Sequence, residues 1–166
     1  MNEVRILKKN LEGLLWLLSQ LKFWQVIMIY MYAVLVKVDK SNIDGQGVFA
    51  IEDIPKGTIA WIFKEKHDIK LSAKEYDSLS SLQKQKMDKT GYLSPWTGFW
   101  VFPSDNDPAQ FTNHSNDSNL SVAFDKSIST EPYFVANRDI TKGEELTNNY
   151  NEFDKITQKT KPIWAK

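Results

Sequence analysis

One polar stretch decides the fold of this chain: Phe111-Thr112-Asn113-His114-Ser115-Asn116-Asp117-Ser118-Asn119-Leu120. Asn, Asp and Ser side chains bond readily to nearby backbone, so such a run can fill a turn for structural reasons alone. A turn does not explain His114, which is one of only two histidines in the chain. Because apolar residues bound the run, we expect a loop that leaves a buried element, and both a structural and a functional role stay open.

The composition limits the classes of protein to consider. With 166 residues, of which 42% are hydrophobic, the chain fits one domain with a short appendage and a real core. Lys plus Arg equals Asp plus Glu at 21 each, so direct nucleic-acid binding is not predicted. The lack of cysteine excludes disulfides, thiolate zinc sites and a cysteine nucleophile. His67 and His114 have no neighbouring ligand cluster, so no metal site is expected.

Residues 1–29 predict an amphipathic helical extension. Its leucines recur at helical spacing, namely Leu11, Leu14, Leu15, Leu18 and Leu21. Polar residues such as Lys22 and Gln25 interrupt the apolar run, whereas a membrane span needs about 20 largely apolar residues. We expect this helix to pack on the domain or on a partner, a second copy of the chain included, and a buried strand to follow within Tyr30 to Val38. A membrane-surface anchor is the less favoured alternative.

Two close glycines, Gly45 and Gly47, follow the polar segment after that strand. Asp44-Gly45 is a strong hairpin signal. Glycines also let a ligand approach the backbone closely, so a hairpin and a binding surface are both consistent with the pattern. Neither a dinucleotide fingerprint nor a phosphate loop is present. A β-rich segment from Thr58 to Phe63 comes next.

Residues 64–110 read as an inserted region of helices and loops. Ser72 followed by Glu75 predicts a capping box. Tyr76, Leu79 and Leu82 then recur every three residues, which predicts one side of a single short helix. An aromatic strand is expected over 98–103. Core packing is the default role of so many aromatic rings, but such rings also suit a narrow pocket for an alkyl ammonium group.

The last third of the chain reads as strands over 121–124 and 132–136, then a turn over 141–144. That turn leads into a polar run that ends at Tyr150, where a strand end is the structural alternative. Residues 154–166 form a basic C-terminal tail that carries Trp164.

Three separated segments, taken together, resemble the SET-domain family of protein-lysine methyltransferases. The segment 45–50 matches the family's opening Gly-x-Gly motif, 111–115 with Asn119 its Asn-His-Ser motif, and 143–147 with Tyr150 its closing motif. They occur in the family's order, and the spacer 137–142 also fits. The resemblance covers about Val34 to Phe153, so we expect a SET domain over residues 30–153.

The resemblance implies a mostly β fold of small sheets with short helices and a C-terminal pseudoknot, in which the segment after Tyr150 threads near the Asn113-His114 loop. It also implies S-adenosylmethionine as cofactor and a protein lysine as substrate, entering by a narrow channel. The cofactor-binding residues would be Gly45, Gln46, Gly47, Asn113, His114 and Tyr150. His114 would then position the cofactor through its backbone and would not act as a general base.

Tyr150 is the predicted catalytic residue, because the family places a tyrosine hydroxyl beside the transferred methyl group and the amine. Tyr92, Phe134 and Asn148 are the expected walls of the substrate channel. Burial beside a positive sulfur lowers the pKa of the target lysine, whose ordinary value is about 10.4. Without a zinc-binding flanking region, cover for the site would have to come from Phe153 or Trp164.

The chain departs from the family's pattern at Ser118, where proline is common, and at Asn148-Asn149, where an aromatic residue and Asp are common. The second departure leaves two functions open. The favoured one is an active lysine methyltransferase, and the alternative is a catalytically inactive SET-like binding or scaffold module. We expect a protein partner carrying the target lysine, no membrane, and an intracellular, cytoplasmic location.

Overall fold

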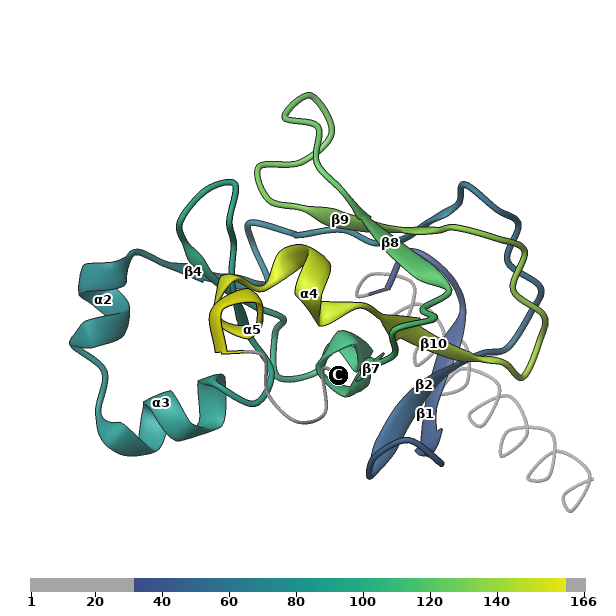
Figure 1. Ribbon diagram of the computed structural model, residues 1–166, viewed down its shortest axis with the longest axis horizontal. Helices are drawn as coiled ribbons and strands as arrows, with labels where there is room; N and C mark the ends of the chain where they lie inside the picture. Colours follow the sequence, from purple (N-terminus) through teal and green to yellow (C-terminus); the bar gives the residue numbers. More distant parts are fainter. Residues whose placement is uncertain (1–31, 161–166) are drawn as a thin grey trace, which may run out of the picture.

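The computed structural model describes residues 32–160, and its largest element is a seven-stranded sheet (Figure 1). The strand order is β1-β2-β10-β8-β9-β3, with β7 paired to β10 beside this path. The strands are β1 (Val36–Lys40), β2 (Gln46–Ala50), β3 (Ile59–Trp61), β7 (Asn113–His114), β8 (Leu120–Ala123), β9 (Tyr133–Ala136) and β10 (Glu145–Asn148). The expected helix over 1–29 and Trp164 lie outside the described residues.

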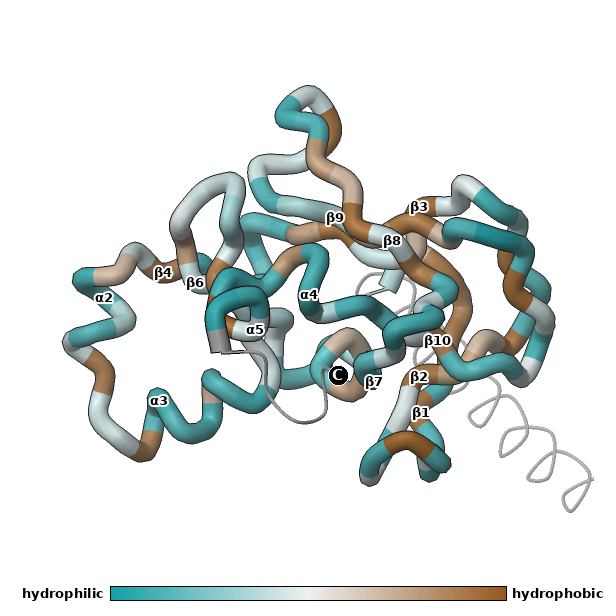
Figure 2. Tube along the Cα trace, viewed as in Figure 1, coloured by the Kyte–Doolittle hydropathy of each residue, from teal (hydrophilic) through white to brown (hydrophobic). Residues whose placement is uncertain are grey.

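The core of this sheet is made of apolar side chains from its central strands, several of which bury consecutive residues. Figure 2 shows hydrophobic stretches along the strands and hydrophilic turns between them. Burying these side chains removes apolar area from water, which is the main favourable term in folding. The fully buried members include Val36, Val48, Ala60, Leu120 and Leu146. The predicted mostly β fold with short helices is confirmed.

The hairpin predicted at Asp44-Gly45 joins β1 to β2 in an antiparallel pair that begins at Lys40 and Gln46. Gly45 has a φ of +44°, a value that glycine adopts without steric cost. The strand expected within Tyr30 to Val38 begins only at Val36, and beyond Val36 it is largely exposed. It is an edge strand, so one side of β1 faces solvent, and the prediction of a buried strand was wrong.

The inserted region forms a second sheet of three strands, in the order β4-β6-β5, with two short helices. Its elements are β4 (Ile69–Leu71), α2 (Ala73–Asp77), α3 (Ser81–Met87), β5 (Tyr92–Leu93) and β6 (Trp100–Phe102). Figure 1 shows α2 and α3 on the side of this sheet away from the main sheet. The aromatic strand predicted over 98–103 is present as β6.

The capping box predicted at Ser72 and Glu75 is confirmed. The single helix carrying Tyr76, Leu79 and Leu82 was a wrong prediction, because α2 ends at Asp77 and α3 begins with its own capping box at Ser80. The serines between them explain the break, since such side chains bond to local backbone instead of continuing a helix. Leu82 is consequently 77% exposed and does not share a buried helix face with Tyr76.

The chain crosses itself where β10 enters the sheet. β10 pairs in parallel with β7 at Asn113 and His114, and in parallel with β8 at Leu120. After β10 come α4 (Tyr150–Phe153) and α5 (Lys155–Thr160), so the first part of the predicted tail is helical. A 3₁₀ helix, η1 (Pro108–Phe111), leads into β7. The described residues contain no helix with the length and apolar character to span a bilayer.

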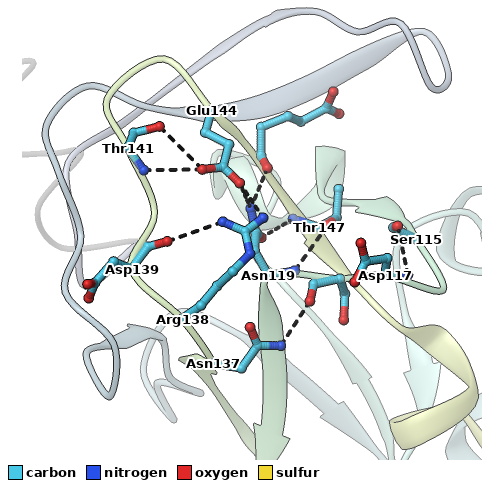
Figure 3. A network of polar contacts seen from close by, with 11 residues as sticks. Ser115, Asp117, Asn119, Asn137, Arg138, Asp139, Thr141, Glu144 and Thr147 are labelled. Carbon is cyan, nitrogen blue, oxygen red and sulfur yellow. Dashed lines mark hydrogen bonds and ion pairs between the residues drawn. The ribbon is translucent and has the colours of Figure 1, made fainter.

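A group of polar side chains, here called the clasp, locks β8 to the turn before β10 (Figure 3). Asn119 is 2% exposed, and its amide donates to the carbonyl of Glu145 at 2.8 Å and to Glu144 Oε1 at 3.0 Å. Its Oδ1 accepts the backbone N–H of Thr147 at 2.9 Å. Arg138 pairs with Glu144 at 2.5 Å. The clasp comprises Asn119, Arg138, Glu144 and Thr147.

Candidate functional site

A cavity of about 700 Å³ lies where the three motif segments meet. Its walls come from the β1–β2 turn, the inserted region, the η1–β7 segment, β9 and the stretch from β10 to α5. Most of the predicted site residues line it, from the cofactor group and the channel group alike. They are Gly45, Gln46, Asn113, His114, Tyr150, Tyr92, Phe134 and Asn148.

Asn113 holds the glycine turn against β10. Its Nδ2 donates to the carbonyl oxygens of Asp44 at 3.2 Å and Gln46 at 3.0 Å, and to Glu145 Oε1 at 2.8 Å. A Cβ built on Gly45 would meet no atom within 4 Å. Gly45 lines the cavity with free space around its Cα, while Asn113 fixes the carbonyl groups on either side of it.

Gly47 does not line the cavity and is buried within β2 instead. A Cβ at this position would lie 2.2 Å from Glu145 Oε1, far closer than any real contact. The glycine thus leaves room for the Glu145 carboxylate, which accepts hydrogen bonds from Ser41 Oγ at 2.8 Å and from Asn113. The family resemblance predicts that Gly47 contacts the cofactor, and in the structure Gly47 packs against Glu145 outside the cavity lining.

His114 contacts the start of α4. Its Nδ1 accepts the backbone N–H of Tyr150 at 3.2 Å, and the two rings lie 5.2 Å apart between centroids. An accepting Nδ1 corresponds to the neutral imidazole with its proton on Nε2. The side chain thereby joins β7 to the residue that carries the predicted catalytic hydroxyl.

The hydroxyl of Tyr150 donates to the carbonyl oxygen of Thr112 at 2.5 Å. Burial raises the pKa of Tyr150 to about 12, and the nearby carboxylates of Asp44 and Asp154 add to that effect. At neutral pH the side chain is therefore a phenol, which can donate a hydrogen bond but cannot accept a proton as a base.

Aromatic rings form one wall of the cavity. Phe153 packs against Phe134 and Tyr92 with edge-to-face geometry, at centroid distances of 4.7 and 5.0 Å. Trp61 tilts against Phe134 at 5.6 Å. Phe153 was expected as a cover for the site, but it is only 5% exposed and belongs to the core. It stabilises the wall and does not form a lid.

Two buried polar atoms in the cavity lining have no hydrogen-bond partner within the described residues, namely Tyr92 Oη and Asn148 Oδ1. Each of these residues is only 6% exposed. Buried polar atoms in folded proteins are nearly always bonded, because an unpaired one costs about 1–3 kcal/mol. A polar group that enters this cavity could therefore bond to these two atoms.

Sequence reasoning missed Asp107, which bonds to Trp61 in the cavity lining. Its carboxylate accepts the Trp61 indole N–H at 2.9 Å and the Ala109 backbone N–H at 2.8 Å. Burial raises the pKa of Asp107 to about 6. The signal in the sequence was the pair Asp107-Pro108, since Asp is favoured as an N-cap and Pro at the first helical position.

Glu145, Thr112 and Asp154 were also missed, because their contacts come from segments distant in sequence.

Within residues 32–160, no group of three or more His, Asp or Glu side chains is arranged to hold a metal ion.

The family model described as SET domain matches residues 45–151. Among solved structures, the chain is similar to the Polycomb Repressive Complex 2 of Chaetomium thermophilum bound to GSK126, with 27% identity and a TM-score of 0.58, over 76% of this chain and 17% of that chain. A humanized mutant of that complex bound to GSK343 gives 25% identity and a TM-score of 0.56, over 76% of this chain and 16% of that one. The chain thus spans about a sixth of each of these two chains. No curated protein sequence matches it.

Proposed function

This chain belongs to the SET-domain family, and from that membership and its cavity we propose that it is an S-adenosylmethionine-dependent methyltransferase acting on a lysine side chain of a protein. The observation that carries the proposal is the meeting of all three motif segments around one cavity, whose lining includes buried polar atoms with no partner in the described part of the chain. A shared fold alone would not support an activity, because one fold hosts many functions.

The residues present suit the cofactor. Asn113, Gln46 and the open backbone at Gly45 would hold its polar amino-acid end, and Asn148 Oδ1 is an acceptor that needs a donor. His114 would help to hold the remaining part through its backbone. When bound, the cofactor supplies a methyl group on a positively charged sulfur.

The chain's own residues would prepare the lysine amine. The aromatic wall of Tyr92, Phe134 and Phe153 excludes water, and burial disfavours the charged ammonium form. A neutral amine is the nucleophile that transfer requires, and free lysine has only about one neutral molecule in a thousand at pH 7.4. Tyr92 Oη, which lacks a partner in the described structure, would bond the amine and orient it.

Tyr150 would contribute by position and by its dipole. Its phenol stays protonated and donates to the carbonyl oxygen of Thr112, so the ring and the oxygen are held in one orientation before substrate arrives. Preorganised dipoles in a water-excluded site are worth much more than the same groups in water. The proton leaves the ammonium before transfer and goes to solvent, and no residue here is assigned as its acceptor.

The proposal is tested by incubating the purified protein with methyl-labelled S-adenosylmethionine and a cell lysate, followed by mass spectrometry. We expect label on lysine side chains of a small set of proteins, and none with a Tyr150→Phe variant that still binds the cofactor. Cofactor binding without label on any protein would contradict the enzyme. Absence of both would favour the scaffold alternative that the Asn148-Asn149 departure raises.

A further inference from the structure

The carboxylate of Asp154 accepts hydrogen bonds from the second sheet and from the C-terminal segment. β5 is an outer strand of the sheet β4-β6-β5, so one of its edges has no strand partner. On that edge the backbone N–H of Leu93 donates to Asp154 Oδ1 at 3.1 Å. This hydrogen bond connects two regions 61 residues apart in sequence, which also touch through the Phe153 and Tyr92 rings.

The same carboxylate organises the start of α5. Its Oδ1 also accepts the N–H of Ile156 at 3.1 Å, and its Oδ2 accepts the N–H of Thr157 at 2.9 Å and the hydroxyl of Thr157 at 2.6 Å. The carbonyl of Asp154 accepts the N–H of Gln158 at 3.0 Å. Hydrogen bonds to an ionised acceptor are roughly twice as strong as neutral ones, so this residue is held firmly at both oxygens.

Asp154 is bonded next to both tyrosines of the cavity. Leu93 directly follows Tyr92, and the backbone N–H of Asp154 donates to the carbonyl of Tyr150 at 2.9 Å. Asp154 itself lines the cavity and also a neighbouring pocket of about 220 Å³. The ring of Phe153, the residue before it, contacts the Tyr92 and Tyr150 rings at 5.0 and 5.7 Å.

We propose that Asp154 is a positioning residue for methyl transfer, which holds Tyr92 of the inserted region at a fixed distance from Tyr150 of the C-terminal segment. The inference rests on the proposed function. It follows from the arrangement of the two tyrosines, because they belong to different sheets or segments and share no strand pairing. A displacement of about 1 Å between reacting groups can lower a rate about 100-fold, so a fixed separation matters for transfer.

Variants of Asp154 separate this role from simple capping of α5. Asn has one acceptor oxygen with the same reach as Asp, and in the position of Oδ1 it accepts the N–H groups of Leu93 and Ile156, while its NH2 group replaces Oδ2 beside Thr157. Ser is also a good N-cap, but its shorter side chain has one oxygen, which cannot cap the helix and reach Leu93 together. Asp154→Asn and Asp154→Ser therefore differ in the bond to Leu93 more than in the cap.

Steady-state kinetics with a lysine peptide give the first test. For Asp154→Ser we expect kcat to fall about 10-fold or more, with the KM for S-adenosylmethionine within about twofold of wild type, in line with the cost of small misplacements. Asp154→Asn should restore most of the rate. A folded Asp154→Ser protein with wild-type kcat would overturn the proposal, as would equal losses in both variants.

Amide hydrogen exchange gives a second test that needs no activity. The Leu93 amide should exchange slowly in the wild-type protein and in Asp154→Asn, and about 10-fold faster or more in Asp154→Ser, because a bonded amide must open before it exchanges. Fast exchange of Leu93 in the wild-type protein would show that the bond is absent. If the wild-type protein transfers no methyl group, the proposed function fails, while slow exchange would still establish the link between the two regions.

Discussion

β10 contributes residues to both the clasp and the cavity, and the two regions differ in whether their buried polar atoms are hydrogen-bonded. In the clasp, Thr147 and Glu145 of this strand bond to Asn119, and each polar atom of the Asn119 side chain has a partner. One residue further along, Asn148 lines the cavity, and its Oδ1 has no hydrogen-bond partner among residues 32–160. In the clasp the polar groups bond to one another and stabilise the fold, whereas Asn148 Oδ1 in the cavity lining is available to a ligand. Variants should therefore affect stability at one end of the strand and activity at the other.

The largest expected effect is on the cavity side. Tyr150→Phe should lower methyl transfer at least about 100-fold, because it removes the hydroxyl dipole that the bond to Thr112 holds in one orientation in a water-excluded site. Unfolding free energy should fall by only about 1 kcal/mol, for the lost bond to Thr112. Kinetics and denaturant titration check both numbers. Near-normal turnover by a folded variant would remove Tyr150 from its catalytic role.

On the clasp side, Asn119→Ala should lower the unfolding free energy by about 2–4 kcal/mol, because it leaves several buried partners unbonded. Asn137→Ala is the matched control, since Asn137 donates to Ser118 and Ser121 near the surface, and it should cost about 1 kcal/mol or less. Denaturant midpoints measure the difference. Equal effects of the two variants would mean that the clasp has no special role.

Two carboxylates distinguish the regions by pH. Burial raises the pKa of Asp107, behind the cavity, to about 6, while the bond to Arg138 in the clasp lowers that of Glu144 to about 2. The folded protein binds a proton at Asp107 more tightly than the unfolded chain does. The contribution of Asp107 to stability is therefore present below about pH 4 and is lost as pH rises to 6. Over that range the unfolding free energy should fall by about 2–3 kcal/mol. Glu144 contributes above about pH 4.5, and that contribution is lost as pH falls toward 2.

Thermal unfolding across pH 2–8 checks these directions. Asp107→Asn should flatten the loss of stability between pH 4 and 6, and Glu144→Gln should leave that loss in place while removing part of the decline in acid. If the Asp107→Asn profile matched that of the wild-type protein between pH 4 and 6, burial of Asp107 would not control stability in that range.

The smallest expected effect is that of Tyr92→Phe on stability. Removing a buried hydroxyl that has no partner in the described structure should leave the unfolding free energy unchanged or raise it by up to about 1 kcal/mol, while transfer to lysine falls. Thr147→Val, a change of similar size in the clasp, should instead lower stability. A marked loss of stability in Tyr92→Phe would show that the hydroxyl has a structural partner.

Local signals in the sequence predicted the parts of the fold that depend on neighbouring residues. The Asp44-Gly45 hairpin and the Ser72 capping box are present, since each is decided within a few residues. The spacing of Tyr76, Leu79 and Leu82 did not predict the break between α2 and α3, because Ser80 caps a second helix there. The family motifs predicted that Asn113 and Tyr150 would approach each other, which the shared cavity shows.

The contacts of Gly47, Asp107 and Asp154 could not be predicted, because each depends on a partner far away in sequence. Only the crossing of β10 with β7 and β8 brings Glu145 behind Gly47, and only the packing of the second sheet brings Leu93 to Asp154. Motifs identify which segments meet, whereas the roles within each motif follow from three-dimensional packing.

Isothermal titration calorimetry with S-adenosylmethionine tests the central claim most directly, that the cavity is a cofactor site. We predict single-site binding with a dissociation constant below about 1 mM, retained in Tyr150→Phe and accompanied by a rise in the thermal midpoint. No heat and no thermal shift at millimolar cofactor would contradict the account.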